Sequence, residues 1–142
     1  MNAGIEHMVP VAHRMGIRII EVLPGRVVGE VGLEGNTNHL GTMYAGVIFS
    51  AAEIIGGVLS IATFDAERFY PIVKTVRIRY RRPATGTVRA ATWLDTATIA
   101  SVREEATANA KADFALDALL TDESGEVIAT TQADYQLVRH GS

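Results

Sequence analysis

The chain contains no cysteine in its 142 residues, which excludes disulfides, thiolate metal ligands and cysteine nucleophiles. Such a composition is compatible with a reducing compartment. A basic excess is also missing: the formal net charge is −3, whereas nucleic-acid-binding domains of this size usually carry a positive surplus. Residues 1–16 hold charges and a proline but no apolar run, so they lack the pattern of a signal peptide. We expect a cytoplasmic protein without a nucleic-acid partner.

What the chain does have is an ordinary globular composition. Hydrophobic residues make up 48% and charged residues 20%, which is too apolar for a disordered chain. A length of 142 residues suits one domain, and no repeat, linker or low-complexity tract divides the sequence. We therefore predict a single domain over residues 1–142. Trp93 and the four tyrosines are expected in its core or at an interface.

One stretch, residues 43–62, is long and apolar enough to cross a bilayer. Its single charged residue, Glu53, falls near the centre, where a charge is costly in lipid. No cluster of lysine or arginine flanks either end. A helix that is apolar on all sides is otherwise buried in protein. We interpret the stretch as a buried helix and expect no membrane contact.

Alternating apolar residues and turn signals predict further elements on both sides of this helix. Strands are expected at residues 17–22, 27–33, 73–83, 87–94, 114–120 and 127–138, and helices at residues 5–14 and 98–111. The long helix should follow Thr42 as its N-cap and stop near Thr63. A single antiparallel sheet must curl around one apolar helix, which gives an α+β architecture. Since one sheet cannot cover such a helix completely, we expect an oligomer, either a homodimer or a dimer of dimers (homotetramer).

One face of the long helix is small and polar, and at helical spacing it consists of Gly46, Ser50, Glu53 and Gly57. The N-terminus of the helix offers free backbone N–H groups and a positive dipole end, which can hold a developing oxyanion. Gly46 has no side chain and lets a carbonyl group approach the backbone closely. The backbone N–H donors and the carboxylate of Glu53 are together the minimum set of groups needed for attack on a carbonyl carbon.

This segment resembles the motif of the hotdog thioesterases related to phenylacetyl-CoA thioesterase. That motif consists of an Asn, a short loop, a His-Gly-Gly sequence and an Asp further along the helix. Asn38 matches the Asn, Glu53 falls on the Asp, and the positions of His-Gly-Gly are taken by Tyr44, Ala45 and Gly46. The spacing of seven residues from Gly46 to Glu53 agrees with the motif.

The resemblance continues through Tyr80-x-x-Pro83 and into the final hairpin, and so covers most of the chain. It implies a hotdog fold and an acyl-CoA thioester hydrolase whose active site is shared across a dimer interface. The helix N-terminus of one subunit, at Gly46, would polarise the thioester carbonyl. Glu53 of the other subunit would attack or activate water, and Asn38 would orient it. Coenzyme A is then part of the substrate, and no separate cofactor is implied.

Further residues are candidates for contacting the substrate. Around the helix N-terminus these are His39, Tyr44, Ala45 and Ser50. A basic stripe precedes Pro83 and comprises Lys74, Arg77, Arg79, Arg81 and Arg82. Arginine grips phosphates bidentately, so Arg79, Arg81 and Arg82 are candidates for binding coenzyme A. The alternative is a solvated strand face paired with neighbouring acids.

Several of these residues also have structural interpretations. Glu53 suits a buried ion pair with an arginine across a dimer, Asn38 suits a turn, and His39 suits an ordinary loop. Gly46 and Gly57 suit close packing of the helix. The four histidines, at positions 7, 13, 39 and 140, show no metal-ligand spacing, so no metal is expected.

Two other functions remain open. Related dehydratases and hydratases use a loop histidine and a helix glutamate, which would be His39 and Glu53 here. The gaps of seven residues on each side of Gly46 depart from their spacing. A protein that binds or senses acyl-CoA without turnover is the other alternative, because Tyr44 and Ala45 replace the usual His-Gly.

Overall fold

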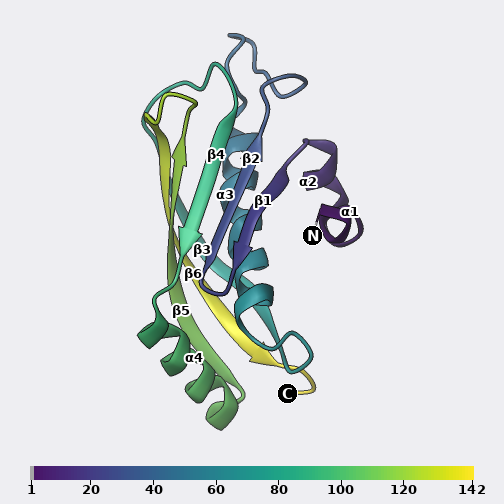
Figure 1. Cartoon of the computed structure of the whole chain (residues 1–142), viewed down its shortest axis with the longest axis vertical. Coiled ribbons are helices and arrows are strands. Elements are labelled where there is room, and N and C mark those ends of the chain that lie inside the picture. The colour runs from purple at the N-terminus through teal and green to yellow at the C-terminus, as the bar shows by residue number, and fades with distance from the viewer. Residues whose placement is uncertain (1) are drawn as a thin grey trace.

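The structure of the chain is a computed structural model that describes residues 2–142, with side chains described from Gly4 onward. In chain order the elements are α1 (Asn2–Met8), α2 (Pro10–Arg14), β1 (Arg18–Leu23), β2 (Arg26–Val31), α3 (Ala45–Thr63), β3 (Phe69–Tyr80), β4 (Val88–Trp93), α4 (Thr96–Asn109), β5 (Lys111–Thr121) and β6 (Val127–Arg139). In this part of the chain six strands form one sheet, in the order β1-β2-β4-β5-β6-β3. Every neighbouring pair of strands is antiparallel. Figure 1 shows the sheet curled around α3, with α4 lying against β5.

Helix α3 is the centre of the hydrophobic core. Ile55 and Leu59 are completely buried, and Val47, Ile48 and Ala51 pack into the same cluster. Within the described chain, α3 is the one helix long and apolar enough to cross a membrane, and more than half of it is buried inside the protein. The prediction of a buried core helix inside a curled α+β sheet is confirmed.

A close contact fixes α3 against β6. A Cβ atom added to Gly56 would lie 2.1 Å from the hydroxyl oxygen of Tyr135. The same hydroxyl donates a hydrogen bond of 3.2 Å to the backbone carbonyl of Glu53. Gly56 is therefore required for packing, and Tyr135 holds the helix at the level of the candidate carboxylate.

The end of α3 is tied to the first hairpin. Gly25, with φ +81°, occupies the turn between β1 and β2, and its N–H donates to the hydroxyl of Thr63 at 2.9 Å. A Cβ at Gly25 would lie 2.8 Å from the carbonyl oxygen of Leu94, so glycine is needed here for both conformation and space. The predicted hairpin and the predicted end of the helix at Thr63 are both confirmed.

Strand β3 forms an edge of the sheet and pairs with β6 along one side. Its apolar side chains Tyr70, Ile72, Val73 and Tyr80 are exposed. A long edge strand with exposed apolar residues is a ready template for pairing with another chain. β3 also starts earlier than expected, and it tolerates Pro71 because a strand at a sheet edge has one side without a hydrogen-bonded neighbour.

Two sequence-based expectations are corrected. The helix expected at residues 5–14 is two helices, because Pro10 lacks an N–H group and starts α2 instead of continuing α1. Thr42 is not the N-cap of α3: the cap is Tyr44, without a side-chain hydrogen bond. The reason is that Met43 donates its N–H to the carbonyl of Ala84 and bridges to Thr37, which keeps the chain extended for longer.

The aromatic residues were expected in the core or at an interface, and the structure of one chain tests only the first of these alternatives. Tyr135 is buried as expected. The other tyrosines and Trp93 do not lie in the core, since Trp93 is 46% and Tyr44 57% exposed, and Tyr70 and Tyr80 are exposed as well. Three of the exposed rings, those of Tyr44, Tyr70 and Tyr80, lie on β3 or at the start of α3. Both elements border the candidate site.

Candidate active site

The N-terminus of α3 presents two free backbone donors. The N–H groups of Val47 and Ile48 both donate to the carbonyl of Tyr44, at 3.0 and 3.3 Å. The N–H groups of Ala45 and Gly46 have no acceptor among the residues that the structure describes. Adjacent N–H groups at the positive end of a helix dipole can stabilise an oxyanion.

The loop before α3 is organised by two asparagines. Asn36 is buried, and its amide donates to the carbonyls of Met15 and Gly32 at 2.8 and 2.9 Å. The carbonyl of Asn36 also accepts from the N–H of Tyr44 at 2.8 Å. The sequence analysis missed Asn36, although it fixes the position at which α3 begins.

The second is Asn38, whose side chain closes the loop. Its Oδ1 atom accepts from the N–H groups of Leu40 and Thr42 at 2.9 and 3.2 Å, and its Nδ2 atom donates to the hydroxyl of Thr42 at 2.9 Å. These contacts support the interpretation of Asn38 as a turn residue. One N–H of the amide has no acceptor among the described residues and remains able to bind a ligand.

A shallow hollow of about 330 Å³ joins this loop to the end of β3. Its lining includes Asn38, Ala45, Tyr80, Arg81 and Arg82, which connects the loop, the helix start and the basic stripe. The hydroxyl of Tyr80 donates to the carbonyl of Ala45 at 2.9 Å. Burial, with a smaller effect of the neighbouring Tyr44, raises the pKa of the Tyr80 phenol. Tyr80 therefore stays neutral and serves as a donor that attaches β3 to the start of α3.

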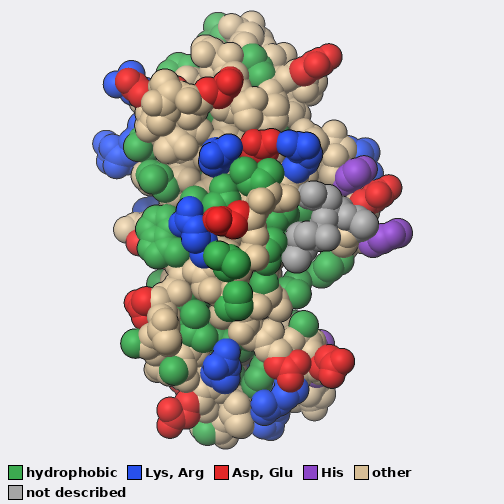
Figure 2. Space-filling view, in the orientation of Figure 1, with side chains coloured by type: hydrophobic (Ala, Val, Ile, Leu, Met, Phe, Trp, Pro, Cys, Tyr) green, Lys and Arg blue, Asp and Glu red, His purple; other side chains and the backbone are tan. Residues whose placement is uncertain are grey.

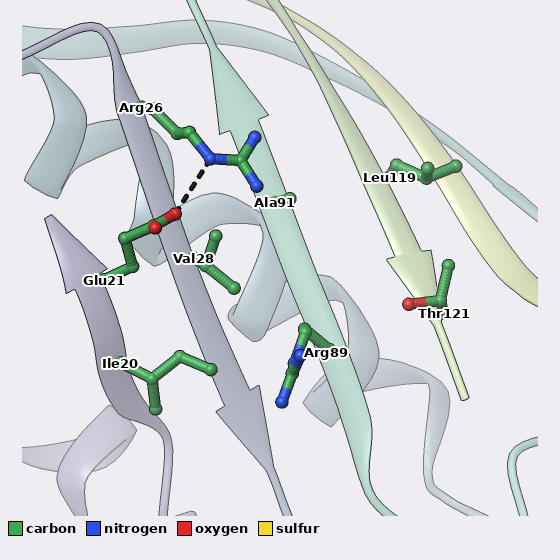
Figure 3. Close-up of a pocket in the computed structure, with 8 residues that line it drawn as sticks. All are labelled: Ile20, Glu21, Arg26, Val28, Arg89, Ala91, Leu119 and Thr121. Atoms are coloured by element: carbon green, nitrogen blue, oxygen red, sulfur yellow. Dashed lines mark hydrogen bonds and ion pairs between the residues drawn. The ribbon is translucent and has the colours of Figure 1, made fainter. Parts of the chain in front are cut away.

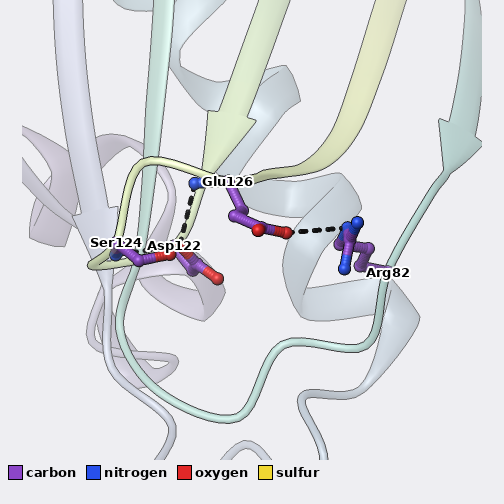
Figure 4. Close-up of polar contacts among 4 residues, drawn as sticks. All are labelled: Arg82, Asp122, Ser124 and Glu126. Carbon is purple, nitrogen blue, oxygen red and sulfur yellow. Dashed lines mark hydrogen bonds and ion pairs between the residues drawn. The ribbon is translucent and has the colours of Figure 1, made fainter.

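The arginines of the basic stripe differ in their contacts. Arg82 forms an ion pair of 2.9 Å with Glu126, which immediately precedes β6, as Figure 4 shows. The adjacent loop is held by Asp122, whose carboxylate accepts from the N–H groups of Ser124 and Glu126 at 2.9 and 3.0 Å. Arg77, Arg79 and Arg81 are exposed, and none of the three has a side-chain partner among the described residues. They are the arginines of this stripe available to an anionic ligand.

Other candidates near the helix start are already engaged or exposed. The hydroxyl of Ser50 donates to the carbonyl of Gly46 at 2.7 Å, inside the helix. His39 is exposed in the loop, and its side chain has no hydrogen bond, ion pair or ring contact with the described residues. The ring of Tyr44 lies over Gly46, since a Cβ at Gly46 would come within 2.6 Å of the ring.

Glu53 lies in a different and larger hollow of about 640 Å³, bordered by α1, α3 and the start of β3. Its carboxylate has no hydrogen bond or ion pair with the residues that the structure describes. Burial raises the pKa of Glu53. The residue is half-buried, as are the other members of the small polar face, Gly46, Ser50 and Gly57.

One chain does not bring Glu53 next to the free N–H groups. Seven residues separate Gly46 from Glu53, and a helix rises about 1.5 Å per residue, so the two lie roughly 10 Å apart along the axis. Ala45, whose N–H is also free, lines the hollow at the loop, whereas Glu53 lines the separate, larger hollow. Each chain therefore carries two candidate half-sites on one helix, one at the free N–H groups and one at Glu53.

His140 was not singled out by the sequence analysis, yet it lines the hollow beside Glu53. Its Nε2 atom lies 3.2 Å from the carbonyl oxygen of Ala66, and its ring is 5.0 Å from that of Tyr70. Only the antiparallel pairing of β3 with β6 brings this C-terminal residue close to α3. Within residues 4–142, no group of three or more potential metal ligands gathers in one place.

A further hollow of about 340 Å³ lies on the outer face of the sheet, over β1, β2, β4 and β5 (Figure 3). Arg26 and Glu21 form an ion pair of 2.8 Å across it. Figure 2 shows hydrophobic side chains mixed with charges of both signs on this face. The hollow lies on the opposite side of the sheet from α3 and shares no residue with the two half-sites.

Similarity to known proteins defines the class. The structure superposes on a Pseudomonas aeruginosa protein of unknown function described as a "probable thioesterase", with a TM-score of 0.89 and 44% identity over 95% of this chain and 91% of that one. A Chlorobaculum tepidum protein of unknown function matches with a TM-score of 0.89 at 17% identity (98% and 92% covered). A Haemophilus influenzae thioesterase matches with a TM-score of 0.77 at 12% identity (98% and 89% covered).

The chain thus has the hotdog fold, which it shares with proteins described as thioesterases, as the resemblance in the sequence predicted. Residues 1–137 match the model of the family DUF4442, a domain of unknown function, and the chain belongs to this family. No curated protein matches the chain by sequence.

Burial of Glu53 leads to a prediction about stability. Because the pKa of the carboxyl is raised in the folded state, ionised Glu53 lowers the free energy of unfolding at pH values above that pKa. Below the pKa of the unfolded state both forms are protonated and the penalty disappears. We expect Glu53→Gln to be more stable than the wild type at about pH 7.5, with the difference shrinking towards about pH 4.

Urea unfolding over this pH range measures the effect. Glu105→Gln, which removes one exposed charge from α4, is the matched control. A stability difference for Glu53→Gln that does not change with pH, or that matches Glu105→Gln at every pH, would contradict the prediction.

Proposed function

We propose that the protein hydrolyses acyl-CoA or a similar acyl thioester. The observation that carries this proposal is Glu53: a half-buried carboxylate without a partner in the described chain, on the same helix face as the free N–H of Gly46. An unpaired buried carboxylate is costly for the fold, so its presence calls for a functional reason. The similarity to proteins described as thioesterases supports this choice of reaction.

The chemistry follows from the two half-sites. The thioester carbonyl oxygen would accept hydrogen bonds from the N–H groups of Ala45 and Gly46 as negative charge develops on it. Glu53 would take a proton from water while the water oxygen bonds to the carbonyl carbon. Collapse of the tetrahedral intermediate breaks the carbon–sulfur bond, and the proton held by Glu53 passes to the leaving thiolate. The products are a carboxylic acid and a thiol.

This chemistry requires two copies of the chain, because one copy keeps Glu53 roughly 10 Å from its own helix N-terminus. The exposed edge of β3 is the surface we propose for the contact, since two such strands can pair antiparallel around a twofold axis. Tyr80, near the helix start, lies at one end of β3, and Tyr70, which lines the hollow beside Glu53, lies near the other. Antiparallel pairing would therefore bring unlike half-sites together in a homodimer, or in a dimer of dimers.

A second candidate function is binding of acyl-CoA without turnover. The observation in its favour is the ring of Tyr44, which lies over Gly46 and covers the approach to one free N–H group. The ring is exposed at the end of a side chain that can rotate. The exposed loop position of His39 gives no comparable support to a dehydratase.

The first test concerns the carboxylate. Glu53→Gln keeps the size of the side chain and removes the base, so we expect thiol release from acyl-CoA to fall by at least about 10²-fold with the fold intact. Asn38→Ala should lower kcat less, because water can replace an orienting amide. The measurement is a thiol-release assay across several acyl-CoAs. Turnover like that of the wild type by folded Glu53→Gln would refute the mechanism, and ligand binding without any wild-type turnover would favour the sensor.

The second test concerns the backbone donors and the shared site. Ala45→Pro removes one free N–H at the first helical position, where proline fits well, and Tyr44 already has the backbone conformation that precedes proline (φ −59°, ψ 134°). We expect normal folding and a loss of about 10²–10³ in kcat. Ala45→Ser, which keeps the N–H, should stay close to the wild type.

Mixing Ala45→Pro with Glu53→Gln subunits then tests the sharing. Half of a statistical mixture is mixed dimers, each with one intact site, so we expect about one quarter of the wild-type activity to return. Sedimentation should show a dimer or a larger assembly for both variants. A folded monomer with full activity, or no recovery on mixing despite subunit exchange, would show that the site is not shared.

The third test concerns the basic stripe. Arg79→Ala and Arg81→Ala should each raise KM for acyl-CoA by roughly two- to fivefold at low salt, with kcat unchanged, because exposed charge pairs are weak and screened. The effect should vanish for an acyl thioester that lacks phosphates. Arg89→Ala, on the outer face of the sheet, is the control. If KM stays the same for acyl-CoA at low salt, the stripe is solvated surface only.

A further inference from the structure

We propose that the hollow beside Glu53 binds the apolar acyl chain of the substrate and that Gly57 sets its depth. This inference rests on the proposed function and deepens it by naming the binding site of the acyl chain and a residue that determines chain-length specificity. It concerns straight hydrocarbon chains, as opposed to polar or charged acyl groups.

The walls of the hollow are apolar and come from three elements. They include Ile5 and Met8 from α1, Gly57 and Ile61 from α3, and Tyr70 and Pro71 from β3. Among its described lining residues Glu53 is the one acid, and the ring nitrogen of His140 lies against the carbonyl of Ala66. The volume of about 640 Å³ falls within the range of small-ligand sites. An acyl chain bound in this apolar hollow would place its thioester carbonyl carbon next to the carboxylate of Glu53, as the proposed reaction needs.

The two adjacent glycines of α3 have different reasons to be glycine. Gly56 is explained by Tyr135, whose hydroxyl would lie 2.1 Å from an added Cβ. A Cβ on Gly57 would meet nothing within 4 Å, and its backbone does not need a positive φ. A glycine inside a helix is unfavourable compared with alanine. The packing of its own chain therefore does not account for Gly57.

Gly57 faces the space that an acyl chain would use. It stands four residues after Glu53, which places both on the same face of the helix, one turn apart. A side chain at position 57 would extend into the hollow next to the carboxylate. The absence of one keeps the route beyond the carboxylate open.

The wall formed by α1 is suited to chains of different shape. Ile5 is 4% exposed and anchors the helix to the core, while Met8 is 65% exposed. Methionine is flexible and polarisable, and it adapts to irregular apolar surfaces. The depth of the hollow is then set by Gly57 on the rigid helix α3. The side chains of α1 adapt to the shape of the acyl chain along its length.

The experiment compares wild type, Gly57→Ala, Gly57→Leu and the control Ala97→Leu, which adds a leucine to an exposed position of α4. The substrates are straight-chain acyl-CoAs from acetyl to palmitoyl, and kcat/KM is measured by thiol release. For the wild type we expect kcat/KM to rise about fourfold per methylene until the hollow is filled. Gly57→Leu should end this rise several carbons earlier, so that kcat/KM falls much more for long acyl chains than for acetyl-CoA. Gly57→Ala should lie between them, and Ala97→Leu should follow the wild type.

Sedimentation and direct binding of dodecanoyl-CoA complete the test. An unchanged chain-length profile in Gly57→Leu would overturn the inference. So would an equal loss for all chain lengths together with dissociation of the oligomer, because Gly57 would then face a second subunit. If the wild type hydrolyses nothing, the proposed function fails. The proposed acyl-chain site is then supported only if Gly57→Leu weakens dodecanoyl-CoA binding at least tenfold more than it weakens butyryl-CoA binding.

Discussion

Burial of α3 in the curled sheet is the constraint on which the rest of the structure depends. Ile55 and Leu59 are completely enclosed, and burial of such side chains contributes roughly 1.5–3 kcal/mol each. Because the sheet covers the helix on most sides, it fixes both the rotation and the height of α3. The free N–H groups at its start and the carboxylate in its middle are thereby held on rigid backbone. The chemistry proposed here needs that rigidity, since backbone donors stabilise an oxyanion only when they are already in place.

Tyr135 shows how closely packing and the candidate chemistry are connected. Its hydroxyl reaches the carbonyl of Glu53, and burial, with a smaller effect of Glu53, raises the pKa of the phenol far above its ordinary value. The phenol therefore remains a neutral donor at any physiological pH. Gly56 makes room for it. The helix is thus held at the level of Glu53 by a contact that leaves the carboxylate itself unpaired and exposed to the hollow.

The sequence was sufficient to predict elements with strong local signals. The apolar run of α3, the Pro-Gly turn at Gly25 and the alternation in β6 all predicted what the structure contains. Spacing on a helix is also a local property, so the half-buried face carrying Gly46 and Glu53 was predictable. The N-cap at Thr42 was predicted wrongly because a backbone hydrogen bond from Met43 to Ala84, 41 positions later, keeps the chain extended there.

Contacts between distant segments explain the other omissions. Nothing in the local sequence indicates that Tyr80 donates to the carbonyl of Ala45, or that His140 lies in the same hollow as Glu53. Both depend on the pairing of β3 with β6 and on the position of that pair beside α3. The resemblance to a family motif singled out Gly46 and Glu53 as candidates, because a motif records long-range geometry that spacing alone does not contain.

The fixed distance between the two candidate half-sites on one helix suits an active site that is built from two chains, as proposed. A helix holds its N-terminus and a residue seven positions later at a fixed offset, so neither group can move to meet the other. In a dimer with a twofold axis, the two α3 helices can run in opposite directions with the same spacing between N-terminus and carboxylate. The start of each helix can then face the middle of the other, which gives two equal sites from one interface. In the proposed homodimer, the unpaired state of Glu53 and the apolar outer edge of β3 would have the same cause, because a second copy would complete both surfaces.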